Sequence, residues 1–154
     1  MAEYLTRDQV ESVALNTPIP FVDSIRCQKG YVFHQQGTGI FVLRGIVNNP
    51  TSCFARYEVE FTGNISIPSG GTVTPIATAI VVSGEERQGS RAIFTPAAID
   101  DYGNVTSRAT VDVPKGCCFT VAVEYVNGTV NDPTTVPTPL INVVDGSLSI
   151  ERKA

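Results

Sequence analysis

Several residue types that carry chemistry are scarce in this sequence. It contains one histidine, one methionine and no tryptophan among 154 residues. Metal sites of the cupin kind need several histidines, so a metalloenzyme on a β-fold is not expected, and we predict no metal and no cofactor. Charged residues make up only 17% of the chain, and the formal net charge is −4. Nucleic-acid binding needs clustered cations, so this composition argues against a nucleic-acid partner.

Long apolar runs are also missing. No segment approaches the roughly 20 apolar residues that a bilayer-crossing helix needs, so no membrane partner is expected. The opening residues, MAEYLTRDQVESVAL, lack the basic and apolar stretches of a secretory signal. The protein is therefore expected to stay inside the cell, to leave by lysis, or to have lost its leader. Hydrophobic residues reach 42%, which is enough for one packed domain and excludes a disordered chain.

The four cysteines do not form a recognisable metal motif. They are Cys27, Cys53 and the adjacent pair Cys117 and Cys118, with no C-x-x-C spacing and only His34 as a histidine ligand. Three alternatives stay open: buried thiols, a Cys27–Cys53 bridge, or a bridge between chains through the adjacent pair. On a strand, neighbouring side chains point to opposite faces, so one of the pair is expected in the core and the other outside or against a second subunit.

Residues 3–15 are predicted to form a short helix. Thr6 followed by Gln9 has the spacing of a capping box, and Leu5 and Val10 flank it as a hydrophobic staple would. A helix of two or three turns is marginal in water, so this segment must pack against something.

The chain is therefore divided into an N-terminal helix or arm, residues 1–17, and a domain of residues 18–154. The arm is predicted to dock the protein onto a larger particle. Its candidate docking residues are Leu5, Thr6, Val10 and Val13.

From residue 21 onward the apolar residues alternate with period two, which indicates strands. The clearest run is residues 54–67, in which Tyr57, Val59 and Phe61 share one face. Residues 75–84 are apolar on both faces and are expected to be central or covered. Many short strands separated by turns predict an all-β, two-sheet jelly-roll sandwich.

No residue stands out as catalytic. His34 is the one candidate general base, but no nucleophile motif accompanies it, so a surface or strand-end histidine is expected. Asp100 and Asp101 lack the spacing of a calcium loop and are expected in a solvated turn. Glu85 and Glu86 are expected on a hairpin tip. Three Asn-x-Ser/Thr sequons, at Asn64, Asn104 and Asn127, matter only in a eukaryotic secretory pathway.

Five segments, in this order, resemble the tumour-necrosis-factor-like jelly rolls. They are GTGIFVLRG, RYEVEFTGNISIP, AIVVSGEERQGSRAI, VDVPKGCCFTVAVEYVNGT and SLSIERKA. That family includes complement-type globular heads and the C-terminal domains of collagen-like spore-surface glycoproteins. The resemblance covers about residues 18–154 and implies a homotrimer. The chain lacks the Gly-X-Y stalk of the spore proteins.

The runs YLT-x-x-QV and VDVP-x-GCC-x-TVAVE are also similar to small proteins of gut Clostridia and their prophages. This likeness implies a non-enzymatic structural protein of a phage virion, such as a head decoration or head fibre. Its place would then be the virion, assembled in the bacterial cytoplasm. The alternative is a structural protein of the bacterial surface, spore coat or exosporium.

A trimer of sandwiches must cover apolar residues that one chain leaves exposed. The second face of residues 76–82 is one candidate for this contact. The other candidates for the subunit interface are Phe94, Tyr102, Cys117 and Cys118. Residues 127–139 are expected to form an exposed loop that binds a host surface or glycan. The candidate binding residues there are Asn127, Thr129, Asn131 and Thr134.

Overall fold

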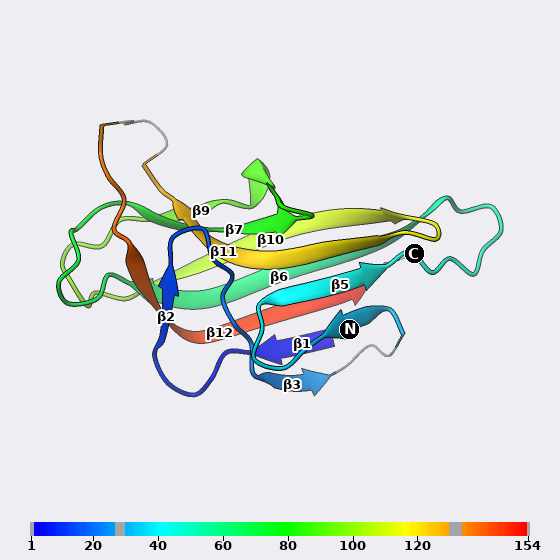
Figure 1. Ribbon diagram of the computed structural model, residues 1–154, viewed down its shortest axis with the longest axis horizontal. Helices are drawn as coiled ribbons and strands as arrows, with labels where there is room; N and C mark the ends of the chain where they lie inside the picture. Colours follow the sequence, from blue (N-terminus) through cyan, green and yellow to red (C-terminus); the bar gives the residue numbers. More distant parts are fainter. Residues whose placement is uncertain (1, 27–29, 130–133, 154) are drawn as a thin grey trace.

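The computed structural model describes residues 2–26, 30–129 and 134–153 (Figure 1). These residues form the predicted all-β sandwich of two antiparallel sheets. Its strands are β1 (Ala2–Leu5), β2 (Glu11–Ala14), β3 (Asp23–Arg26), β4 (Val32–His34), β5 (Ile40–Arg44), β6 (Phe54–Ser66), β7 (Ile76–Val82), β8 (Glu85–Glu86), β9 (Ala92–Phe94), β10 (Gly103–Pro114), β11 (Cys118–Asn127) and β12 (Leu140–Arg152). A single 3-10 turn, Gln88–Ser90, is the helical part of the described chain.

The two sheets are open at both sides of the sandwich. Sheet A has the strand order β10-β6-β12-β1-β3, and β2 also pairs with β12. Sheet B has the order β4-β5-β11-β7-β8, and β9 also pairs with β7. One side of the molecule therefore carries the edge strands β3 and β4. The opposite side carries β10 of sheet A and β8 and β9 of sheet B.

The alternating pattern of β6 decides which face of sheet A is buried. Tyr57, Val59 and Phe61 are fully buried between the sheets, while Glu58 and Glu60 lie on the outer face. The period-two prediction for this strand is confirmed. Tyr57 also joins the two layers, because its hydroxyl donates a hydrogen bond of 2.6 Å to the backbone oxygen of Arg44 on β5. Burial raises the pKa of the Tyr57 phenol above its ordinary value.

Strand β7 is buried along its whole length, as its apolar pattern predicts. Its inward-facing Thr78 meets Ser107 of β10, and their hydroxyl oxygens lie 2.9 Å apart. Both side chains are fully buried. Ala77 and Ala79 are fully buried as well, so much of the second face of β7 is already covered within one chain.

The predicted helix at residues 3–15 is wrong. The segment forms β1 and β2, and β1 lies between β12 and β3 in sheet A. Thr6 does not cap a helix: its amide donates to the oxygen of Gly146, and its Oγ1 accepts from the amide of Gly146, each at 3.0 Å. Pairing with a long neighbouring strand satisfies more backbone groups than an isolated helix of two turns, so the tertiary partner decides the conformation.

Strand β12 is longer than its sequence suggests. The segments INVV and SLSIER belong to one strand whose pairing with β6 shifts register between Val144 and Ser147. Asp145, in the shift, has a positive φ of 54°. No helix in the described part of the chain is long and apolar enough to cross a bilayer.

Candidate functional site

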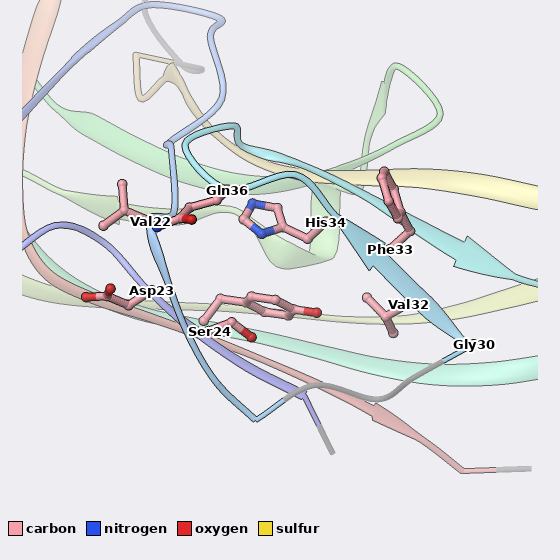
Figure 2. Close-up of a pocket in the computed structure, with 9 residues that line it drawn as sticks. Val22, Asp23, Ser24, Gly30, Val32, Phe33, His34 and Gln36 are labelled. Atoms are coloured by element: carbon pink, nitrogen blue, oxygen red, sulfur yellow. The ribbon is translucent and has the colours of Figure 1, made fainter.

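A concave surface lies at the open side of the sandwich, between the edge strands β3 and β4 (Figure 2). Its volume is about 550 Å³. We call it the β3–β4 cleft. It is lined by Tyr4, Val22, Asp23, Ser24, Gly30, Val32, Phe33, His34 and Gln36. Three segments that are distant in sequence contribute to it, namely β1, the run into β3, and β4 with the turn that follows.

A tight turn after β4 places one wall of the cleft. His34 ends β4, which confirms the expected strand-end position. The amide of Thr38 donates to the oxygen of Gln35, and the amide of Gly37 donates to the oxygen of Phe21. Gly37 has a φ of 85°, a conformation that favours glycine. The turn is thereby tied to the body of the protein, with the exposed side chain of Gln36 at its tip.

The imidazole of His34 is held by packing and by one hydrogen bond. It stacks on Phe41 with ring centroids 4.3 Å apart, and it meets Tyr4 edge-on at 5.0 Å. Its Nε2 lies 2.8 Å from the oxygen of Thr38. A carbonyl oxygen can only accept, so Nε2 carries the hydrogen and Nδ1 carries the free lone pair of the neutral ring.

The opposite wall is polar and exposed. Asp23 and Ser24 project from β3, and in Figure 2 the ring of His34 lies next to Gln36. Among the described residues that line the cleft there is no Lys or Arg. The cleft therefore combines a carboxylate, an amide, a hydroxyl and an imidazole with aromatic rings. Such a set can accept and donate hydrogen bonds to a neutral ligand.

One nitrogen of His34 is committed to the backbone. His34 uses Nε2 on a backbone carbonyl, so this nitrogen is not aimed at a nucleophile. Among the described residues, no group of three His, Cys, Asp or Glu side chains could hold a metal ion.

Exposed apolar residues gather at the opposite side of the sandwich. Ile93 is 50% exposed, Ile99 is 38% exposed and Tyr102 is 42% exposed, while Phe94 is half-buried. They lie on β9 and on the connection to β10, where both sheets end. We call these four residues the β9–β10 edge. Two of them, Phe94 and Tyr102, are predicted interface residues, and the structure brings them to the same edge.

The adjacent cysteines are not divided between core and surface. Cys117 precedes β11 in a turn, Cys118 begins that strand, and both are exposed free thiols. The prediction that one of them enters the core is wrong, because the turn after Pro114 places the pair at the end of the sandwich. Cys53 is also an exposed free thiol, and Cys27 lies outside the described residues. A bridge between chains through the adjacent pair stays a prediction.

The predicted docking residues differ in exposure. Val10 is 45% exposed and Leu5 is half-buried, whereas Val13 and Thr6 are buried in the sandwich. The last two are therefore part of the core of this domain. Docking of the N-terminal segment onto a particle stays a prediction.

The predicted binding loop is partly closed on itself. The side-chain oxygen of Asn127 accepts a hydrogen bond of 2.8 Å from the amide of Thr129, and Thr129 is buried. Thr134 is exposed, and Asn131 lies outside the described residues. Binding by this loop stays a prediction.

The outer face of sheet A is highly charged. Arg56 donates to Asp112 through two nitrogens at 2.8 and 3.1 Å, and this hydrogen bonding lowers the pKa of the Asp112 carboxyl. Arg108 lies 3.7 Å from Glu58 and 3.9 Å from Glu60 across the strands. At the rim of sheet B, Glu86 is not simply solvated, because it forms an ion pair with Arg91.

Sequence reasoning missed most of the β3–β4 cleft. It singled out His34 but not Tyr4, Asp23 or Gln36, because no motif joins residues from three separate segments. The only signal was indirect: a histidine at the end of a strand, followed by a Gly-Thr-Gly turn. The β9–β10 edge was found in part, through the aromatic residues near its strands.

Comparison with known proteins finds similar structures but no similar sequences. No protein-family model and no curated protein matches the sequence. Among solved structures, the Eiger TNF from S. frugiperda superposes with a TM-score of 0.65 at 9% identity, covering 100% of this chain and 92% of that one. The globular domain of zebrafish complement 1qA gives 0.58 at 16% identity, with coverages of 95% and 93%. Murine APRIL at pH 5.0 gives 0.52 at 14% identity, with coverages of 93% and 97%.

These likenesses extend over nearly the whole chain. The sequence identities are too low to carry over any function. The chain has the two-sheet jelly-roll fold of the tumour-necrosis-factor and complement C1q type.

Proposed function

We propose that this chain is a non-enzymatic structural protein that assembles as a homotrimer on the surface of a particle, most simply as a head decoration or head fibre of a bacteriophage. The observation that carries the proposal is the β9–β10 edge, where apolar side chains remain exposed at the ends of two edge strands. Exposed apolar patches and unpaired strand edges favour association with another chain. The chain has the fold of the tumour-necrosis-factor-like jelly rolls, and the resemblance to that family implies a homotrimer. Both points support another copy of this chain as the partner.

The remaining surface of the edge strands favours an ordered assembly rather than aggregation. Strand β10 is 12 residues long, but its outward positions carry polar residues such as Thr106, Arg108 and Asp112. Charged residues on an edge strand oppose uncontrolled pairing with other sheets. The apolar contact is therefore confined to the short stretch from Ile93 to Tyr102. We propose that this stretch packs against a neighbouring subunit in a closed, cyclic arrangement.

The oligomer is tested by native mass spectrometry of the full chain. A homotrimer has three times the 16.5 kDa mass of one chain. Ile93→Ser and Tyr102→Ser are expected to shift the population toward monomers, because each replaces a large exposed apolar side chain by a small polar one. Ile40→Ser is the matched control, since Ile40 is also a 50% exposed isoleucine but lies on β5.

A wild-type protein that is monomeric at micromolar concentration contradicts the oligomer. A trimer that survives both edge substitutions but dissociates with Ile40→Ser places the contact on the outer face of sheet B instead.

The particle is tested by locating the protein. Induction of a prophage-bearing host, followed by proteomics of the purified virions, is expected to detect this chain among the structural proteins. Detection in spore-surface extracts of the same host, with none in virions, favours the alternative role on the spore or cell surface.

A further inference from the structure

We propose that the β3–β4 cleft binds a neutral saccharide of one or two sugar units. The cleft lies on the side of the sandwich opposite the β9–β10 edge, so it does not depend on the proposed trimer contact. Its volume of about 550 Å³ falls within the range of about 300–1,000 Å³ that small-molecule sites occupy.

The polar lining of the cleft suits sugar hydroxyls. The Asp23 carboxylate only accepts hydrogen bonds, while the Gln36 amide both donates and accepts, and Ser24 adds a hydroxyl. Planar carboxylate and amide groups can bind two neighbouring hydroxyls at once. Within residues 2–26, 30–129 and 134–153, these three side chains have no protein partner, so their hydrogen-bonding capacity remains available.

His34 adds one oriented acceptor. Its Nε2 is committed to the oxygen of Thr38, so the lone pair of the neutral ring is on Nδ1. The stack on Phe41 holds the ring plane in place before any ligand arrives. A fixed acceptor loses little conformational entropy on binding, and this preorganisation favours affinity.

Apolar side chains border these polar groups. Val22 and Val32 line the cleft and are half-buried. Phe33 is 62% exposed, but its side chain faces the outside of sheet B, opposite to that of His34 on the same strand. Figure 2 shows Val32 at the end of the cleft away from Asp23. A pyranose ring has an apolar C–H face and a polar rim of hydroxyls. The cleft presents a matching division, with valine side chains beside the hydrogen-bonding groups.

The negative charge of Asp23 favours neutral over acidic sugars. Asp23 is the ionisable acid in the lining, and among the described residues that line the cleft none is a lysine or arginine. An acidic sugar would place its carboxylate near that of Asp23, and the repulsion between the two carboxylates is unfavourable. A peptide is disfavoured by length, because β3 has four residues and β4 has three, too few for a long added strand.

Saturation-transfer difference NMR on the full chain tests this inference. The probes are D-galactose, D-glucose, N-acetyl-D-glucosamine and their disaccharides, with N-acetylneuraminic acid as the acidic sugar. We expect transfer to at least one neutral sugar and none to the acidic sugar. Asp23→Ala and Gln36→Ala should each weaken binding by about tenfold, the equivalent of one or two hydrogen bonds. Gln35→Ala is the matched control, since Gln35 is exposed and adjacent but does not line the cleft.

The inference is overturned if none of the neutral sugars shows transfer, if the acidic sugar binds as well as they do, or if Asp23→Ala and Gln36→Ala bind like Gln35→Ala. Circular dichroism of each variant checks that the exposed substitutions leave the fold intact. A monomeric protein that still binds a neutral sugar would contradict the proposed trimer and keep this inference, so the two proposals fail separately.

Discussion

The buried contact between Thr78 and Ser107 gives a sharp test of how the two sheets are joined. Ser107 Oγ donates to the backbone oxygen of Thr78 at 3.2 Å, so its hydrogen is already used. The 2.9 Å contact between the hydroxyls is then a bond in which Thr78 donates and Ser107 accepts. The two single substitutions therefore have different consequences, although they break the same contact.

Ser107→Ala leaves the buried Thr78 hydroxyl without its acceptor, which we expect to cost about 1–3 kcal/mol of the free energy of unfolding. Thr78→Val leaves Ser107 bonded to the carbonyl, and Val also suits a strand, so we expect a loss of only about 0.5–1 kcal/mol. The double variant has no orphaned hydroxyl and should be more stable than Ser107→Ala alone.

Urea unfolding of the wild type, the two single variants and the double variant, all at the same protein concentration, measures these free energies. The chain has no tryptophan, so far-UV circular dichroism follows the unfolding. A double variant less stable than Ser107→Ala, or a Thr78→Val protein less stable than Ser107→Ala, would refute the assigned direction of the hydrogen bond.

Two further predictions concern the glycine of β10 and the buried tyrosines. A Cβ at Gly103 would lie 2.4 Å from ring carbons of Phe94, so Gly103→Ala should lower the free energy of unfolding by about 1–3 kcal/mol, whereas Gly89→Ala, with open space around it, should change it little by the same urea assay. Burial raises the pKa of Tyr125 to about 12 from an ordinary value of 10.0, so the unfolded chain loses this proton first as the pH rises. The stabilisation is thus complete below pH 10 and is lost as the pH rises toward about 12; thermal unfolding and tyrosinate absorbance should show this loss, and a Tyr125 that ionises near pH 10 in the folded protein contradicts it.

The strands of the main body could be predicted because their patterns are local. In β6 the alternation of Tyr57, Val59 and Phe61 with charged residues needs one buried face and one exposed face, whatever the partners are. The uniform burial of β7 followed from its apolar residues in the same way. The N-terminal segment could not be predicted by such reasoning, because Thr6 and Gln9 satisfy a helical motif equally well and the deciding partner, Gly146, lies at the other end of the chain.

The candidate sites show the same division. Phe94 and Tyr102 drew attention as aromatic residues near strands, but their meeting at one edge depends on how the two sheets end. The β3–β4 cleft had no sequence signature, because Tyr4, Asp23 and Gln36 come from segments with no fixed spacing. The position of Cys117 was missed for a similar reason: the turn, rather than the strand period, decides where its side chain lies.

By itself, the order of polar and apolar residues determined that this chain forms a sandwich of strands with a single core, since burying alternate side chains is a local requirement of each strand. Only the tertiary structure decided which strands lie at the edges, and therefore where the cleft and the exposed apolar edge lie. Strand pairing joins residues as far apart as Ala2 and Ile150, and the free energy of that pairing depends on every other strand being in place.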